Sequence, residues 1–459
     1  MSEGSSHCPS TLQLPVEVCE RIINHIAMGW DISHHFVADE PHVSTLASCA
    51  LVCQDWYFLT WYHLRQRIHL RDRKDVLSLS KTLHAKPRLR EVVRQVVISG
   101  ASPGKRQPIR HLGTFAAMLA NRAPALWRIT IQDAEWTTGS VRREDIAYLA
   151  AFGSIGTLIV RKVTLSSVAQ LSCLVSALPR LRALWCVNVS CLQKQQVSPV
   201  SLPLNCANLE GLEVRWAAPA VEEFFVQISW ASRVRFLNLG VVGEVDPSSR
   251  SATSRSQTVL DASSASAETV ALHIDPRFPV RDARHYNFSR HDHLRRLAIW
   301  LYHPFAEWPW IPHILSHIVS KHFQAMSVML VVRTAHMADD LDGMLTTMGR
   351  DDALARLDSI LQEKRFSGTI ASRGVCIGIH YDNDSWASGD EQFGMGLALR
   401  ERHNRWDELV RQKMPHSHGR GIVTTVHNFQ EFDNWKTDVV EIRTSMPAEE
   451  TNANLKGEA

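Results

Sequence analysis

The chain of 459 residues lacks a long hydrophobic run. Its longest apolar stretch, near residues 326–332, is far too short for a bilayer, which needs about 20 apolar residues. The first residues contain neither a basic start nor an apolar segment, and residue 2 is not glycine. The sequence therefore predicts neither a signal peptide nor myristoylation, and we expect a cytoplasmic or nuclear protein without a membrane partner.

Paired cysteines and excess charge are also missing. The nine cysteines form no C-x-x-C pair, which indicates reduced thiols and not a disulfide framework. The net charge is only +3, so the whole chain has no general attraction to nucleic acid. Residues 65–94 are a local exception, with ten lysines and arginines against three acidic residues. This run is either a solvated helix face or a docking patch for an acidic surface.

Catalytic and metal-binding motifs are absent as well. The sequence has no G-x-S-x-G, no Walker loop and no H-E-x-x-H. Residues 340–343 are similar to part of a calcium loop, but Ala338 and Gly349 stand where oxygen ligands belong. The histidine-rich segments 34–42, 291–293 and 416–418 lack the spacing of zinc ligands. We therefore predict no catalytic residue, no cofactor and no metal site.

The amino-terminal region contains two apolar stripes at helical spacing. Pro15 at the first helical position and Glu17 in the first turn favour the start of a helix. Val18, Ile22 and Ile26 then repeat every four residues. The second stripe consists of Leu46, Cys49, Ala50, Cys53, Trp56 and Tyr57. Two helices of this size bury too little surface to be stable alone, so the segment needs a partner.

Residues 12–62 resemble the F-box, the helical module that docks a receptor protein on the Skp-family adaptor of cullin-type ubiquitin ligases. The resemblance rests on Leu14, Pro15, Glu17, Val18, Ile22, Ile26, Leu46, Cys49, Leu51, Val52, Cys53, Trp56 and Leu59. It implies a non-catalytic substrate receptor of an SCF-type ligase, with the adaptor and the cullin complex as partners. An ordinary helical hairpin is the alternative.

The resemblance also implies which residues bind the adaptor. They are Leu14, Pro15, Glu17, Val18, Ile22, Ile26, Leu46, Leu51, Val52, Trp56 and Leu59. The spacing leaves open which of Leu51, Val52, Cys49 and Cys53 faces the adaptor. The segment 27–43 is longer than the usual connection in such modules, but a longer loop adds little closure entropy.

An apolar triplet of the form L-x-x-L-x-L recurs along the rest of the chain. Its third members are Ile98, Ile131, Val160, Cys186, Val214, Leu239, Ile274 and Ile299. They lie 25 to 35 residues apart, which is the interval of leucine-rich repeats. Further strands are expected around 326–331 and 374–379, and helices at 114–123, 143–153, 166–178, 220–231, 351–364 and 401–413.

The predicted fold is therefore α/β: a small helical F-box-like module followed by a leucine-rich-repeat-like αβ solenoid with a parallel sheet on its concave face. We assign residues 12–62 to the module, 63–92 to a helical connector, 93–440 to the solenoid and 441–459 to a disordered tail. The Ser-rich segment 247–266 is expected to be a mobile surface insertion. The repeats lack the usual asparagine or cysteine, so an ordinary α/β sheet domain is the alternative.

The residue between the second and third apolar positions of each triplet points to the concave face. Taking one residue from each successive triplet, this row includes Ile159, Trp185, Glu213, Asn238, His273 and Ala298. We predict that Ile159, Trp185, Glu213 and Asn238 bind an unidentified target protein, with Trp185 as the anchor. Alternatively, the carboxy-terminal segment covers Trp185 as core. A rival function is a solenoid scaffold, or nucleic-acid docking through the basic residues 65–94.

Overall fold

The structure is a computed structural model that describes residues 14–32, 41–100, 105–136, 139–193, 202–242, 252–275, 286–302, 310–332, 335–367, 370, 374–381 and 392–426. The chain divides into two compact units, unit 1 (Met1–Ile155) and unit 2 (Gly156–Ala459). The described residues include fourteen strands of a large parallel sheet, with helices between most successive strands. The predicted α/β class with a parallel sheet is confirmed.

Unit 1 consists of a three-helix module followed by the first strands. Its elements are α1 (Val16–Ile32), α2 (Pro41–Cys49), α3 (Gln54–Gln66), β1 (Arg67–Leu70), α4 (Arg73–Ala85), the 3-10 helix η1 (Pro87–Arg90), β2 (Gln95–Ser99), β3 (Gln107–Pro108), α5 (Leu112–Leu119), β4 (Arg128–Trp136), α6 (Arg143–Ala147) and η2 (Tyr148–Ala151). Strand β2 lies between β1 and β4, and β3 also pairs with β4.

The segment expected to be a helical connector contains a strand. Strand β1 pairs in parallel with β2, with Ile68 opposite Val96. The sheet therefore begins at Arg67 and not near residue 93, so the assignment of 63–92 was wrong in part. A strand of four residues with two basic side chains has too weak a pattern to stand out within a charged run. Its pairing with β2 makes it a strand.

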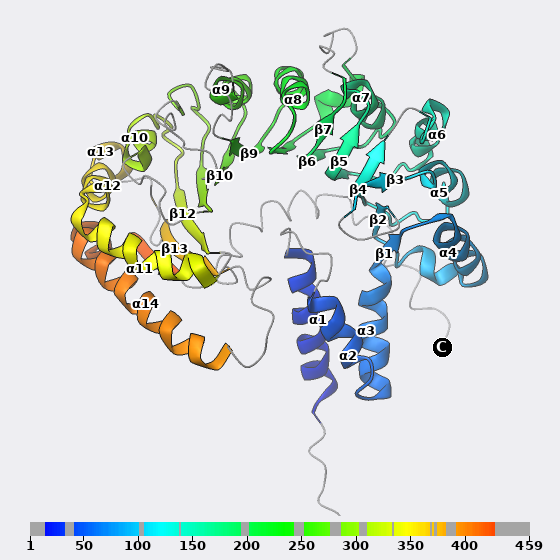
Figure 1. Cartoon of the computed structure of the whole chain (residues 1–459), viewed down its shortest axis with the longest axis horizontal. Helices are drawn as coiled ribbons and strands as arrows, with labels where there is room; N and C mark the ends of the chain where they lie inside the picture. The colour runs from blue at the N-terminus through cyan, green and yellow to red at the C-terminus, as the bar shows by residue number, and fades with distance from the viewer. Residues whose placement is uncertain are drawn as a thin grey trace, which may run out of the picture. The chain divides into compact units, whose positions relative to one another are not determined.

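Unit 2 repeats a strand and a returning helix. Its elements are β5 (Thr157–Leu165), α7 (Val168–Ser176), β6 (Ala183–Val187), β7 (Ser190–Cys191), η4 (Leu204–Asn208), β8 (Gly211–Arg215), α8 (Pro219–Ala231), β9 (Phe236–Val242), α9 (Ala252–Ser263), β10 (Thr269–Asp275), β11 (Arg296–Leu301), α10 (Trp310–Ser316), β12 (Ala325–Val332), α11 (Ala335–Arg350), α12 (Ala353–Leu361), α13 (Lys364–Ser367), β13 (Val375–Tyr381), α14 (Gln392–Lys413), α15 (Pro415–Gly419) and β14 (Val423–Val426). Helices α8, α9 and α10 lie on one side of the strands (Figure 1).

The core of unit 2 lies between its strands and helices. Leu158 is opposite Leu184, which is followed by Leu212 and Leu237 on the next strands. All four side chains are buried, as the triplet pattern predicts. Side chains alternate along a strand, so the residue that follows each of these leucines points away from the helices. We call that side of the unit 2 sheet the inner face.

The predicted register is wrong at β10 and again at β12, whereas the triplet predicted for β11 keeps its place. Leu237 pairs with Val270 and not with Leu272, and Val270 pairs with Leu297. Strand β10 has apolar residues at 270, 272 and 274, so two phases of the triplet fit the sequence equally well. The row that contains Asn238 therefore continues to Ala271 and Ala298, and His273 belongs to the next row with Trp300. In the same way, Met326 takes the second triplet position, not the first.

The Ser-rich segment is not a surface insertion where the structure describes it. Residues 252–263 form helix α9, the returning helix of its repeat. Val259 and Leu260 on this helix are buried, and so are the hydroxyl residues Ser256 and Ser263. Small hydroxyl residues conceal the helical pattern because they usually favour turns. The predicted tail 441–459 and the predicted solenoid beyond residue 426 lie outside the described residues.

Residues in the left-handed conformation recur at the same place in four successive repeats. Asp133, Lys162, Asn188 and Trp216 have φ angles of 48°, 50°, 55° and 52°. Each lies two residues after the third apolar position of its triplet. A left-handed conformation is costly for lysine and tryptophan, so the surrounding structure must hold it in place. The repeats thus share one backbone turn that their side chains do not reveal.

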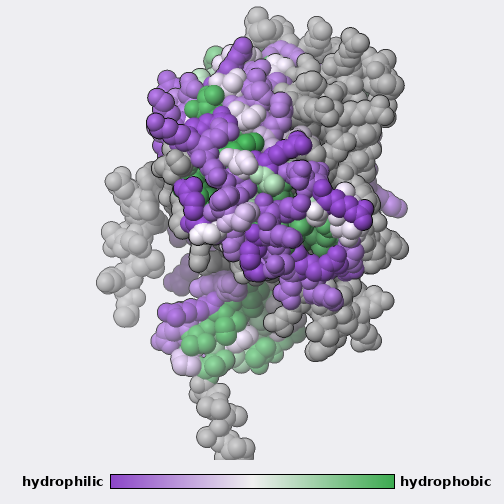
Figure 2. Space-filling model, turned by 90° about the vertical axis from the view of Figure 1, so that its left-hand side faces the viewer, coloured by the Kyte–Doolittle hydropathy of each residue, from purple (hydrophilic) through white to green (hydrophobic). Residues whose placement is uncertain are grey.

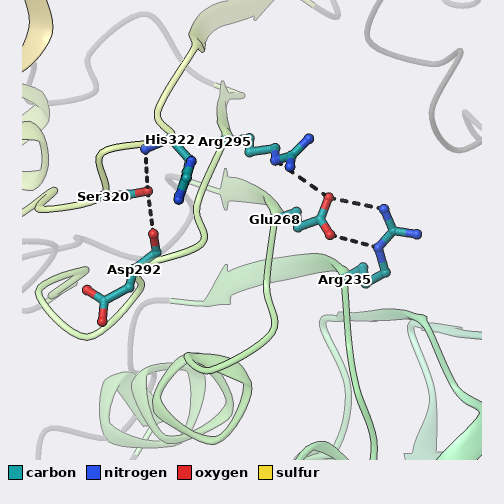
Figure 3. A network of polar contacts seen from close by, with 6 residues as sticks. All are labelled: Arg235, Glu268, Asp292, Arg295, Ser320 and His322. Atoms are coloured by element: carbon teal, nitrogen blue, oxygen red, sulfur yellow. Dashed lines mark hydrogen bonds and ion pairs between the residues drawn. The ribbon is translucent and has the colours of Figure 1, made fainter. Parts of the chain in front are cut away.

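Serine side chains connect successive repeats at the edge where the strands begin. The Ser266 hydroxyl donates to the carbonyl of Val234 at 2.8 Å. The Ser320 hydroxyl donates to the carbonyl of Asp292 at 2.8 Å and accepts from the amide of His322 (Figure 3). Each bond satisfies a backbone carbonyl at the end of a repeat, where no regular partner exists. These bonds fix the spacing between neighbouring repeats.

Candidate functional site

The helical module of unit 1 has a small core of its own. Ile23 of α1 and Leu46 of α2 are fully buried against each other. Ile26, Trp56 and Leu59 are partly buried around them. Leu46 was assigned to the adaptor surface, and this assignment is wrong, because its side chain is already enclosed within the module. The same packing places Ile26, Trp56 and Leu59 at the border of the core.

A second apolar stripe on α1 faces outward. Leu14, Val18 and Ile22 are spaced by four residues and are 56%, 38% and 36% exposed. Leu51 and Val52, in the turn between α2 and α3, are 88% and 65% exposed. Figure 2 shows hydrophobic residues gathered over the module at the bottom of the view. The structure thus answers which of the four residues face outward: Leu51, Val52 and Cys53 are exposed, while Cys49 is partly buried against the core.

The beginning of α1 is close to its prediction. Helix α1 begins at Val16, and the Pro15 carbonyl accepts hydrogen bonds from the amides of Val18 and Cys19. Pro15 therefore precedes the first helical residue, one position earlier than predicted. Glu17 is exposed in the first turn, where the helix dipole favours a carboxylate.

Three exposed aromatic residues of α3 were not among the predicted adaptor contacts. Tyr57, Phe58 and Tyr62 are 46%, 59% and 39% exposed. Phe58 and Tyr62 have the i, i+4 spacing that places two side chains on one face of a helix. Of the fifteen large hydrophobic residues exposed in the described part of the chain, nine lie between residues 14 and 62. This concentration is typical of an interaction surface and not of scattered surface residues.

The predicted target residues are aligned on the inner face of unit 2. Ile159 pairs with Trp185, Trp185 with Glu213, and Glu213 with Asn238. Ile159, Trp185 and Asn238 are half-buried, so Trp185 is neither core nor fully exposed. The Asn238 carboxamide oxygen is buried and has no hydrogen-bond partner among the described residues. This row therefore offers a partner the half-buried Trp185 as an aromatic surface.

Glu213 has a structural role that corrects its assignment as a target contact. Its carboxylate is paired with the guanidinium group of Arg215, and both residues are buried. Arg215 Nη1 lies 3.4 Å from Nδ1 of His273, which is 2.7 Å from the Tyr302 hydroxyl. Because a guanidinium group can only donate, Nδ1 of His273 accepts. The His273 ring is stacked on Trp300 at 5.6 Å.

Backbone geometry brings this polar and aromatic cluster together. A Cβ atom on Gly240 would lie 2.7 Å from Cα of Arg215, so only glycine permits the observed approach of β9 to β8. The left-handed Trp216 follows, and its ring packs edge-on against Tyr302 at 6.1 Å. The Arg215 guanidinium group lies 5.4 Å from the centre of the Trp216 ring. The cluster packs on the inner face next to the half-buried Trp185, which pairs with Glu213.

The calcium-loop-like segment lies in a helix. Asp342 of α11 forms ion pairs with Arg402 and Arg405 of α14, at 3.1 and 2.7 Å. Among the described residues, no three histidine, cysteine, aspartate or glutamate side chains gather closely enough to hold a metal ion. Nor does any described helix combine the length and the apolar character needed to span a membrane.

No protein-family model matches the chain, and a search of curated proteins finds no significantly similar sequence.

Proposed function

We propose that the protein is a substrate receptor of an SCF-type ubiquitin ligase. The helical module binds a Skp-family adaptor within a cullin complex, and the inner face of unit 2 binds a target protein. The observation that supports this most directly is the exposed apolar surface of the module, at residues that carry the F-box resemblance. The receptor itself catalyses no step, because it acts by holding the target close to a charged ubiquitin carrier.

The proposal includes a location in the cytoplasm or nucleus. All the cysteines that the structure describes are free thiols, as is usual in reducing compartments.

Adaptor capture is the test of this function. The full-length chain is co-expressed with a tagged Skp-family adaptor, and the eluted complex is quantified. We expect the parent to co-purify and the variant Leu14→Ala with Pro15→Ala to lose most of the capture. Leu192→Ala, at a residue of unit 2 that is 65% exposed, is the matched control and should leave capture unchanged. Capture of the double variant at the level of the control would exclude the F-box assignment.

The basic run of unit 1 supports a second candidate, nucleic-acid docking. Eight of its lysines and arginines are exposed before, in and after α4: Arg65, Arg71, Arg73, Lys74, Lys81, Lys86, Arg88 and Arg94. Binding through this face would weaken steeply with salt, because each phosphate contact releases counterions. Salt-dependent binding to duplex DNA in the absence of adaptor capture would favour this candidate over the receptor.

A further inference from the structure

A ladder of charged residues crosses the edge of unit 2 where its strands begin. Backbone hydrogen bonds connect five of them in spatial order. The amide of each residue donates to the carbonyl of the one before, at 2.7 to 2.9 Å, through Arg182, Glu210, Arg235, Glu268 and Arg295. Each residue immediately precedes one of the strands β6, β8, β9, β10 and β11, so the five lie at one level of the sheet edge. The charges along this level alternate in sign.

In this ladder, the Glu268 carboxylate lies between Arg235 and Arg295, which precede strands two apart in the sheet. Both oxygens of Glu268 accept hydrogen bonds from Arg235, at 2.9 and 3.1 Å, and Arg295 lies 3.9 Å away on the other side (Figure 3). The hydrogen bond from Arg235 is the main reason that the pKa of Glu268 lies below its usual value. Neighbouring strands are about 4.8 Å apart, so the two arginines are separated by about 10 Å.

Two residues earlier, the turns before β6 and β9 contain a second pair of arginines, without a carboxylate. Arg180 and Arg233 precede Arg182 and Arg235 by two positions, and both are exposed. Between them stands Asn208, whose amide donates to the carbonyl of Pro179 at 3.5 Å. An uncharged group therefore occupies the place that Glu268 takes in the ladder. Among the described residues, no carboxylate compensates the charges of Arg180 and Arg233.

The whole edge has a concentrated positive charge. The turns before β6, β8, β9, β10, β11 and β12, together with Arg296 at the start of β11, contain eight arginines and lysines and three carboxylates. The basic residues are Arg180, Arg182, Arg233, Arg235, Arg290, Arg295, Arg296 and Lys321, and the acidic ones are Glu210, Glu268 and Asp292. This excess of five charges exceeds the net charge of +3 of the complete chain. The edge is therefore a distinct cationic surface, which we call the basic edge.

We infer that the basic edge binds an acidic segment of a partner protein, with one of its carboxylates between Arg180 and Arg233. Glu268 demonstrates that arginines at this spacing accept a carboxylate, and the planar guanidinium fork suits that group. A peptide in the polyproline II conformation has three residues per turn and rises about 3.1 Å per residue, so every third side chain lies on the same side and advances by about 9 Å, close to the distance across two strands. The partner segment therefore has acidic residues at every third position.

Fluorescence anisotropy tests this inference on the full-length chain. The probe is a labelled peptide of about twelve residues with glutamate at every third position and Gly-Ser between, and a glutamine version is its control. The variant Arg180→Glu with Arg233→Glu should weaken binding at least about tenfold and flatten the salt dependence. Arg350→Glu with Arg356→Glu changes the net charge equally, at exposed positions of α11 and α12, and should have less than about a twofold effect.

Each contrary outcome has a clear meaning. Equal losses in the two variants would show a net-charge effect, and the inference would be overturned. It would also fail if the parent did not bind the glutamate peptide, or bound duplex DNA more tightly through the same two arginines. Arg180→Gln with Arg233→Gln, which introduces no new charge, should give a smaller loss in the same direction. Adaptor capture involves unit 1 and should be unchanged by all these variants, so this test is independent of the proposed function.

Discussion

Leu51→Ala combined with Val52→Ala should separate binding from folding in the helical module. The two side chains are 88% and 65% exposed, so truncation removes little that stabilises the free protein. Burying a leucine or valine side chain contributes about 1.5–3 kcal/mol. Truncation to alanine removes the side-chain carbons beyond Cβ of both residues. The double variant should therefore lose about 3 kcal/mol of binding free energy for the adaptor, which is roughly a hundredfold increase in Kd. The free energy of unfolding should change by less than about 1 kcal/mol.

The measurement is a calorimetric titration of the purified chain with a Skp-family adaptor, together with a thermal melt. Leu46→Ala is the contrasting variant: its side chain is fully buried, so it should destabilise the module by about 2–5 kcal/mol. Leu204→Ala in unit 2, at a fully exposed leucine, should change neither quantity. An unchanged Kd for the Leu51 and Val52 variant would refute the assignment of this surface to the adaptor. A loss of stability like that of Leu46→Ala would show that the two residues are core.

Three further predictions concern unit 2. Leu184→Asp places a carboxylate among the buried leucines of neighbouring strands, at a cost of several kcal/mol of stability. Soluble expression should therefore fall sharply. A melting temperature equal to that of the parent would contradict the repeat register. Gly240→Ala should destabilise unit 2 by about 1–3 kcal/mol through its contact with β8, whereas Gly343→Ala, whose Cβ meets nothing within 4 Å, should be neutral or stabilising in the same melt. Burial raises the pKa of Glu222 to about 7, against the opposing effect of Arg255. The folded state thus binds a proton more tightly than the unfolded one, and stability should fall as pH rises from about 4.5 to 7. Glu222→Gln should remove this slope in urea unfolding, and parallel profiles for parent and variant would exclude it.

Short-range patterns in the sequence determined the alternating face of each strand and the position of most helices. The triplet spacing placed Ile159, Trp185 and Asn238 in one row, and the structure confirms their alignment. It also indicated the amphipathic returning helix α8 almost to its ends. These features depend on neighbours within a few residues, because a period of two or 3.6 fixes which side chains share a face.

Contacts between distant residues decided the rest. Ile22 and Ile23 are adjacent and equally apolar, yet Ile23 is buried and Ile22 is 36% exposed, since the packing of α2 selects one stripe of α1 as core. In β10 two phases of the apolar pattern were possible, and only pairing with β9 selected Val270 as the partner of Leu237. Periodicity fixes the face of a residue but not its neighbour on the next strand. For that reason the sequence indicated two apolar stripes and a solenoid, whereas the exposed module surface, the buried Arg215 cluster and the basic edge emerged only from the tertiary structure.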